Sequence, residues 1–136
     1  DLFDDSKAVM CVKHDHRPAT GVKMDNQVQT VYPRKNWSSV FAVQIEHPAN
    51  AALTVDLVNS VPGRDLHRFS WIDDDDLIGA LPEEWNWLAG HSDPSIDPRI
   101  VHPTEGSPCL PGYEDAPYAD EFWDVLFDWA AGVESD

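Results

Sequence analysis

The sequence predicts a single α/β domain over residues 1–136, of the α+β type, with a mixed β-sheet flanked by helices and an amphipathic helix at its C-terminal end. Two observations predict the sheet. Residues 8–12 and 40–43 are short apolar runs rich in β-branched and aromatic side chains, which is typical of strands covered on both faces. One observation predicts the helix, because residues 119–130 carry apolar side chains at helical spacing.

The first half of the chain is predicted to form strands and one short helix. Strands are expected over residues 8–12, 28–32 and 39–45. Thr54 is a suitable N-cap for a helix that continues to Val61, because its hydroxyl can accept a hydrogen bond from the first helical turn. Pro62 and Gly63 follow and end this helix.

The second half opens with four consecutive aspartates at residues 73–76, followed by the apolar residues 77–81. Because an anionic first turn complements the helix dipole, we expect a helix to begin at this acidic run. Residues 85–88 are expected to return to the core, and residues 99–102 to form a short strand. A loop rich in proline and glycine then extends to Pro117.

The C-terminal helix has the clearest pattern in the sequence. Its predicted apolar face consists of Ala119, Phe122, Trp123, Leu126, Phe127 and Ala130. The remaining positions are mostly acidic, so one face of the helix is polar. Gly132 lies just beyond the last apolar residue, where glycine commonly ends a helix.

The net charge of −16 is unevenly distributed along the chain. Residues 1–68 carry eight acidic and eight basic side chains, whereas residues 69–136 carry seventeen acidic side chains and only Arg99 as a base. Nucleic acid is therefore not expected as a partner, because phosphate binding requires a basic face. Divalent cations, high solubility and a saline habitat are all compatible with this charge.

Cysteine content and hydropathy bear on the location of the protein. Cys11 and Cys109 are too few for a disulfide framework, so a reducing, cytoplasmic setting is expected, although one bridge between them stays possible. No apolar run approaches the roughly 18 residues that a membrane span requires.

Residues 32–39 carry the densest group of polar and aromatic side chains ahead of a predicted strand. They read Tyr-Pro-Arg-Lys-Asn-Trp-Ser-Ser. Polar groups at the end of a strand lie at the sheet edge, where open α/β folds bind their ligands. The alternative is a polar loop before a core strand, with Trp37 as a packing residue.

Three further groups have both a structural and a functional interpretation. His14 and His16 flank Asp15 at a strand end, where they could bind a metal or simply form a polar terminus. The aspartates at 73–76 suit a solvated helix start, sugar hydroxyls or a hard cation such as Mn²⁺ or Mg²⁺. His102 leads from a strand into a loop that can bring backbone close to a ligand. It is either a ligand-facing residue or a histidine at the core edge.

Several motifs in this order resemble one known family. The segments concerned are residues 1–3, 9–15, 32–39, 47–50, 53–54, 58–59, 66–69, 71, 78–88 and 102–106. The more specific ones are the octapeptide at 32–39 and Leu-Pro-x-x-Trp-Asn at 81–86. Over nearly its whole length the chain resembles the C-terminal portion of bacterial and phage-associated glycosyltransferase-like proteins. These are similar to the glycogenin-like, GT-A-fold nucleotide-diphospho-sugar transferases.

This resemblance implies the acceptor-side half of a GT-A fold, without the N-terminal nucleotide-binding half. It also implies that Mn²⁺ or Mg²⁺ bridges the donor diphosphate, with His102 as a metal ligand. The implied catalytic residues, which orient sugar hydroxyls, are Asp73, Asp74, Asp75 and Asp76. The implied donor-binding residues in the same cleft are Arg34, Lys35, Asn36 and Asn86.

The expected function is hexose transfer from a nucleotide sugar to a glycan or small acceptor. Half of the donor site is missing and Gln44 and Cys109 depart from the family pattern, so this chain alone is not expected to catalyse the reaction. The alternative is a non-catalytic binding or assembly module, such as a carbohydrate-binding remnant or a phage or structural component. A sheet edge exposed by the missing half would favour homo-oligomers formed through strand pairing or apolar contacts.

Overall fold

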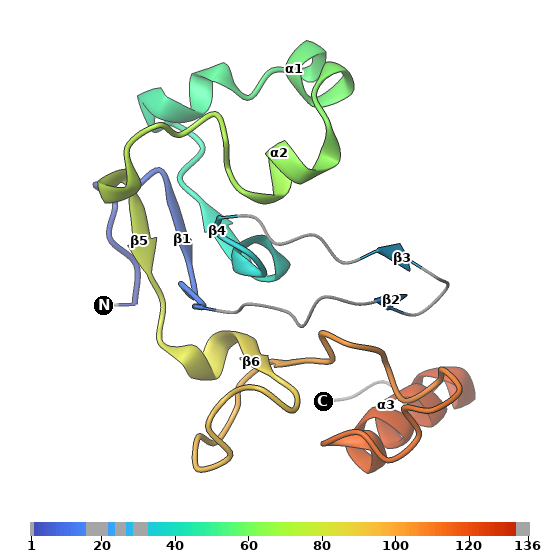
Figure 1. Cartoon of the computed structure of the whole chain (residues 1–136). Coiled ribbons are helices and arrows are strands. Elements are labelled where there is room, and N and C mark those ends of the chain that lie inside the picture. The colour runs from blue at the N-terminus through green and yellow to red at the C-terminus, as the bar shows by residue number, and fades with distance from the viewer. Residues whose placement is uncertain (1, 16–21, 24–26, 29–32, 133–136) are drawn as a thin grey trace.

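The computed structural model describes residues 2–15, 22–23, 27–28 and 33–132. Short strands and helices follow one another in the α+β class that the sequence predicts (Figure 1). Helices α1 (Val55–Ser60) and α2 (Gly63–His67) lie at one end of the molecule, and α3 (Ala119–Ala131) lies at the other. The central sheet stands between them.

The central sheet contains β4 (Phe41–Val43), β1 (Val9–Cys11) and β5 (Ile78–Ala80), in that spatial order. β1 pairs antiparallel with β4 and parallel with β5, which confirms the mixed sheet. The apolar run at 8–12 becomes the middle strand because pairing on both sides satisfies its backbone while its side chains are buried.

Two small sheets of two strands each accompany the central sheet. β2 (Val22–Lys23) pairs antiparallel with β3 (Gln27–Val28), and β6 (Trp87–Leu88) pairs parallel with β7 (Val101–His102). The strand expected over 99–102 therefore forms in its last two residues. Of the strand expected over 28–32, residues 29–32 lie outside the described part of the chain.

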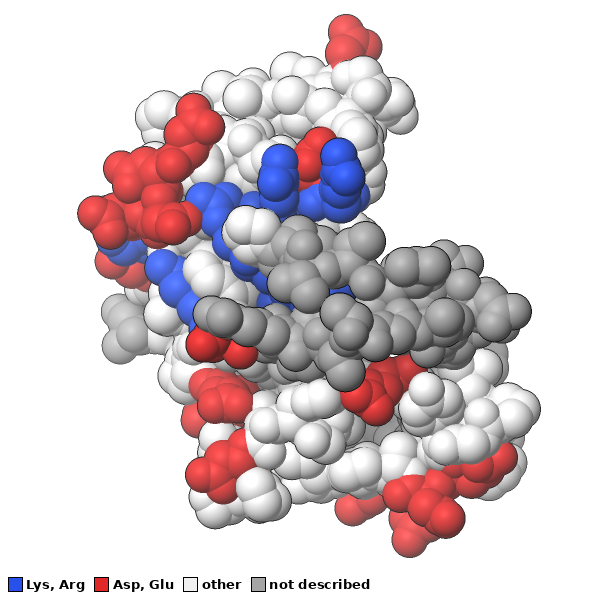
Figure 2. All heavy atoms as spheres, in the orientation of Figure 1, with Lys and Arg blue, Asp and Glu red and all other residues white. Residues whose placement is uncertain are grey.

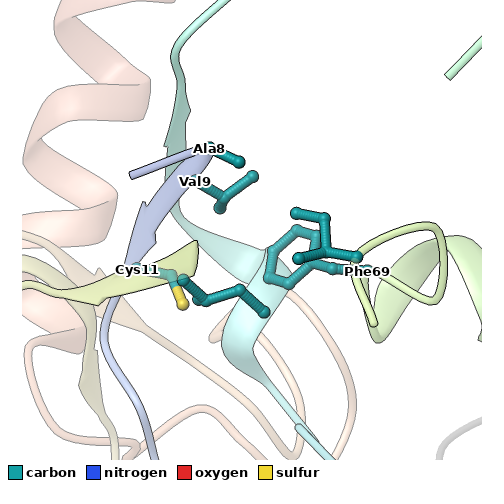
Figure 3. Packing of buried hydrophobic residues seen from close by; sticks show 6 residues of the cluster. Ala8, Val9, Cys11 and Phe69 are labelled. Atoms are coloured by element: carbon teal, nitrogen blue, oxygen red, sulfur yellow. The ribbon is translucent and has the colours of Figure 1, made fainter. Parts of the chain in front are cut away.

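The main core forms where β1 and β5 meet the segment that follows α2. It contains Ala8, Val9, Cys11, Phe69, Ile72 and Ile78, all at most 2 % exposed (Figure 3). Met10, Val12 and Leu81 form a second buried group. Because β1 alternates its side chains between the two groups, it contributes to both cores.

The connections are built largely from short helical turns. These are the 3₁₀ turns η2 (Trp37–Ser39), η3 (Pro48–Ala52), η4 (Asp75–Leu77) and η5 (Glu83–Asn86). The predicted cap of α1 is confirmed, since the Thr54 hydroxyl accepts a 3.2 Å hydrogen bond from the Leu57 amide. α2 was not expected; it begins directly after Pro62, whose ring ends α1 and favours a new helical start.

Two expectations about the central sheet are wrong. The last two aspartates of the run form the 3₁₀ turn η4 together with Leu77, and strand β5 follows instead of a helix, because parallel pairing with β1 buries Ile78 and Gly79. β4 is also less buried than expected. It is one of the two edge strands of this sheet, and Phe41 remains 46 % exposed.

α3 matches the predicted C-terminal helix almost to the residue. It ends at Gly132, whose positive φ of 72° allows its amide to reach the carbonyls of the last turn. However, no residue of α3 is buried, so its apolar side chains are only partly covered by the rest of the domain. Across the described ranges, no helix combines the length and the hydropathy needed to cross a bilayer.

Candidate functional site

The turn at residues 33–39 lies at the centre of the candidate site, and its side chains contact the segments on either side of it. Arg34 and Asn36 both have positive φ angles, of 60° and 62°. Asparagine tolerates this conformation, but for arginine it is uncommon and must be held by other contacts. The alternation of normal and left-handed residues directs neighbouring side chains toward different segments of the chain.

Arg34 holds the segment between α2 and β5. Its guanidinium donates hydrogen bonds to the carbonyls of Arg68 (2.8 Å), Phe69 (2.9 Å) and Ile72 (3.1 Å). Its Nε also donates to the Asp75 carboxylate over 3.0 Å. The Arg34 side chain is only 14 % exposed, so these contacts are partly shielded from water. The segment 68–75 is thereby fixed in place next to the turn.

A pocket of about 320 Å³ opens beside this arginine, and we refer to it as the arginine pocket. Its lining residues are Pro33, Arg34, Arg68, Ser70, Ile72, Asp73 and Asp75. Cationic and anionic side chains therefore share one small cavity with a hydroxyl group. Arg68 Nε is buried and no described residue accepts its hydrogen. The cavity thus combines strong donors with strong acceptors.

The face around this site is divided by charge. Figure 2 shows Lys and Arg side chains gathered in one region, directly beside a group of Asp and Glu side chains. Arg34 and Asp75, which both line the arginine pocket, form an ion pair. A neutral ligand with many hydroxyls can use both signs of charge, since each hydroxyl both donates and accepts.

A second polar group lies on the other side of the 33–39 turn, and we call it the amide cluster: Asn36, Ser39, Asn86 and Thr104. Asn36 donates to the Thr104 hydroxyl over 2.9 Å. Asn86 donates to Ser39 Oγ (2.8 Å) and to the Asn36 carbonyl (3.2 Å). Because that carbonyl only accepts, the orientation of the Asn86 amide is fixed. Its Oδ1 is then a buried acceptor for which no described residue supplies a donor.

His14 lies next to the amide cluster. Burial lowers its pKa below the ordinary value, although the carboxylate of Glu83 and a hydrogen bond to the backbone of Asn86 act in the opposite direction. The Trp37 indole donates to the His14 carbonyl over 2.9 Å. The Lys13 ammonium lies over the Trp37 ring, 5.6 Å from its centre, as in a cation–π contact.

The structure divides the predicted site residues into two groups on either side of the turn. Arg34, Asp73 and Asp75 share the arginine pocket, whereas Asn36 and Asn86 belong to the amide cluster. Asp74 and Asp76 are exposed, as Asp73 and Asp75 are too. Asp74 caps η4 by accepting from the Asp76 amide, and the Asp76 carbonyl accepts from the Lys7 ammonium. Lys35 is half-buried within the turn.

His102 is the last residue of β7. It lies opposite Leu88 in the β6–β7 pair, and its carbonyl accepts from the amides of Ala89 and Thr104. Within the described ranges, no three His, Cys, Asp or Glu side chains come together as a metal site. A metal role for His102, with Mn²⁺ or Mg²⁺, therefore stays a prediction. His16 lies outside the described residues.

Sequence reasoning did not assign Arg68, Ser70 and Thr104 to a site. Arg68 and Ser70 flank the buried Phe69, which has a φ of 55°. This backbone turn places both residues at the pocket. No local sequence pattern predicts the left-handed conformation of Phe69 on which the turn depends. Thr104 follows a short strand within a proline-rich loop, where a hydroxyl is an ordinary turn residue.

Comparison with known proteins gives one clear relative. Over 125 residues the chain is 46 % identical to Protein CDI of Arabidopsis thaliana, a match that covers 88 % of this chain and 48 % of that protein. The chain thus spans about half the length of the curated relative that it matches. No family model matches the sequence, and no solved structure matches it.

These findings correct the resemblance drawn from the sequence. The similarity to glycogenin-like, GT-A-fold glycosyltransferases is wrong, because neither a family model nor a solved structure of that kind is found, and the relative that does match bears a different name. Two residues of the motifs behind that resemblance instead stabilise the fold. Trp37 and Asn86 are both held by hydrogen bonds inside the fold.

Proposed function

We propose that this chain binds a carbohydrate, with the arginine pocket as the site for one sugar ring. The observation that carries this proposal is the mixture of charges in one small cavity. Arg68 and the Ser70 hydroxyl offer donors, while Asp73 and Asp75 offer acceptors. The five N–H groups of Arg34 are already bonded inside the protein, so Arg34 contributes positive charge and shape to the pocket. A sugar ring presents neighbouring hydroxyls that donate and accept, so it matches both.

Size and charge favour this ligand class over others. A volume of about 320 Å³ is at the small end of the range for ligand pockets, which suits a single ring more than an extended chain. A phosphate or diphosphate is disfavoured, because Asp73 and Asp75 would repel it. An isolated metal ion is disfavoured in turn by the two guanidinium groups. A neutral polyol experiences neither repulsion.

Hexose transfer from a nucleotide sugar stays a separate proposal. In that case Asp73 and Asp75 would orient hydroxyls of the sugar or acceptor, and a donor site with its metal would have to include other residues.

The net charge of −16 makes nucleic acid an unsuitable partner, because its phosphates would be repelled. Two free thiols, Cys11 and Cys109, support a reducing compartment such as the cytoplasm.

The test is a titration of the chain with glucose, galactose, mannose and N-acetylglucosamine, followed by NMR signals of the Arg34 and Arg68 side chains. We expect saturable shifts with a Kd on the order of 1 mM for at least one sugar. Asp73→Asn replaces a charged acceptor in the pocket, so binding should weaken about tenfold or more. Asp76→Asn makes the same chemical change outside the pocket and should leave the Kd unchanged.

Three outcomes would contradict the proposal. These are the absence of shifts with every sugar, equal shifts in Asp73→Asn and the unsubstituted chain, or shifts confined to residues away from the pocket. A parallel titration with UDP and UDP-hexose, with and without Mn²⁺, tests the transfer proposal. Tighter binding of UDP-hexose than of the free hexose, lost when Mn²⁺ is withheld, would support a donor site.

A second candidate function is assembly with another protein chain. One observation favours it: α3 buries none of its residues, although Val125, Phe127 and Trp129 are 71 %, 63 % and 77 % exposed. Exposed apolar side chains grouped on one element commonly mark an interaction surface. This function does not exclude carbohydrate binding, because α3 and the arginine pocket are built from different elements.

A further inference from the structure

A groove of about 470 Å³ lies between α3 and the segment that follows β7, and we call it the α3 groove. One wall consists of Tyr118, Glu121, Phe122, Val125, Leu126 and Trp129. These positions recur at intervals of three and four residues, so they form one continuous face of the helix. Val101, Pro103 and Pro108 form the opposite wall.

The groove is lined mainly by apolar side chains, and some of these side chains are exposed to solvent. Val125 and Trp129 line it, yet they are 71 % and 77 % exposed. Tryptophan is the residue most enriched among those that dominate binding energy at protein interfaces. Leaving such side chains in water forgoes the free energy of burying them. A partner that covers the groove would recover this energy.

A row of carboxylates runs along one side of the groove. Glu121, Asp124 and Asp128 are spaced at i, i+3 and i+7, so they follow one another along the helix surface. Residues 100–136 contain nine acidic residues and neither Lys nor Arg. The lower right of Figure 2, where α3 lies in Figure 1, accordingly shows acidic side chains and no basic ones.

We propose that the α3 groove binds an amphipathic helix of a partner protein, and that the polar face of this helix is cationic. The proposal rests on the assembly role stated above and adds the chemistry of the partner. A second copy of α3 fits less well, because it would bring another row of carboxylates against the first. A cationic helix instead pairs its Lys or Arg with Glu121, Asp124 and Asp128 while its apolar side chains enter the groove.

The dimensions of α3 fit this mode of recognition. Its 13 residues extend over roughly 20 Å, enough to accompany three to four turns of a second helix. Helix-in-groove complexes use apolar anchors at i, i+3 or i+4, and i+7. Since the paired charges would lie at the rim, added salt should weaken binding without abolishing it.

The experiment uses three synthetic peptides of equal length as probes. The first is an amphipathic helix of Leu and Lys, the second has the same pattern with Glu in place of Lys, and the third has the composition of the first in a scrambled order. Binding is measured by calorimetry, and the contact surface by NMR signals of the Trp129 indole. We expect only the Leu and Lys amphipathic peptide to bind tightly, with a Kd that rises with salt concentration.

Matched variants separate the groove from the overall negative charge. Trp129→Ala should weaken binding at least tenfold. Phe127→Ala removes another exposed aromatic of α3 that lies outside the groove lining, and it should change the Kd less than twofold. Replacing Glu121, Asp124 and Asp128 by their amides should weaken binding and flatten the salt dependence. The same charge change at Asp5, Glu46 and Asp56, all exposed and distant from α3 in sequence, should not.

Each contrary result would overturn a different part of the proposal. If sedimentation shows a dimer that Trp129→Ala dissociates, assembly stands but the partner is a second copy. If the scrambled peptide binds as well as the amphipathic one, charge alone is responsible and the groove has no role. If no peptide binds and the chain stays monomeric, assembly through α3 fails as well.

Discussion

The side-chain amide of Asn86 donates a 2.8 Å hydrogen bond to the hydroxyl of Ser39, a residue 47 positions earlier in the chain. Asn86 is completely buried, and the same amide reaches the Asn36 carbonyl over 3.2 Å. One side chain therefore fixes the turn before β6 against the turn before β4. This relationship makes Asn86 a structural residue, whatever ligand the neighbouring pocket binds.

Asn86→Leu should lower the free energy of unfolding by about 2–4 kcal/mol, because a similar volume is kept while two buried hydrogen bonds are lost. Ser39→Ala removes one of them and should cost about 1 kcal/mol. Urea denaturation followed by circular dichroism measures both. Asn59→Leu makes the same change on the exposed side of α1 and should stay within about 0.5 kcal/mol of the unsubstituted chain. Equal losses in both Asn→Leu variants would contradict this account.

Gly79→Ala should destabilise the sheet by about 1–3 kcal/mol. A Cβ at this position would overlap Met10 Sδ and lie 2.9 Å from Lys7 Cγ, so the buried Met10 side chain would have to shift within the second buried group. Gly63→Ala is the control, since a Cβ there meets nothing within 4 Å. Thermal melts compare the two variants. The explanation is wrong if Gly79→Ala and Gly63→Ala have the same Tm, or if adding Met10→Ala does not partly relieve the defect.

The lowered pKa of His14 predicts a pH dependence of stability. Burial is the main cause, so the folded protein binds a proton at His14 less readily than the unfolded chain does. As the pH falls below about 6.5, the unfolded chain takes up this proton first and the folded state loses stability. The loss is complete once the pH lies below the folded-state pKa. Above about pH 6.5 His14 is neutral in both states and contributes no slope.

Urea midpoints measured between about pH 5 and 7.5 test this sign. His14→Asn should flatten the slope in the acidic part of that window, whereas His91→Asn, which leaves His14 in place, should retain it. A steeper slope in His14→Asn, or stability that increases as the pH falls, would show that His14 is stabilised in its charged form.

The two cysteines should react at very different rates. Burial raises the pKa of the Cys11 thiol to about 12, despite the nearby Lys13 and Arg34, so its thiolate is scarce and shielded. Cys109 is exposed. With a thiol-specific reagent near pH 8, we expect one fast equivalent from Cys109 and a second only on unfolding. Cys109→Ser should abolish the fast phase; a fast phase that survives in this variant would place Cys11 at the surface.

Local patterns predicted the elements whose signals are themselves local. The Thr54 cap, the apolar run of β1 and the helical spacing of α3 each operate within a few residues, and the structure confirms all three. The aspartate run misled for the same reason. A capped helical start is its best local conformation, but pairing of the following residues with β1 decides the outcome.

The site depends on contacts that no local pattern contains. Side chains of the 33–39 turn bond to partners as far apart as His14, Asn86 and Thr104, the last of them 68 positions away. Arg34, Asp73 and Asp75 were grouped only through the family resemblance that proved wrong, so their sharing a pocket was not predicted from the residues themselves. Sequence reasoning did not place Arg68 and Ser70, whose position depends on the left-handed backbone at Phe69.

The position of β1 in the sheet has a consequence during synthesis on the ribosome. β1 leaves first, and its antiparallel partner β4 follows about 32 residues later, but its parallel partner β5 lies 69 residues behind it, as Val9 opposite Ile78 shows. At a translation rate of 5–20 residues per second, one edge of this wholly apolar strand stays unpaired for about 3–14 s. Newly made chains should therefore depend on chaperones during that interval, and slowing translation between β4 and β5 should increase aggregation.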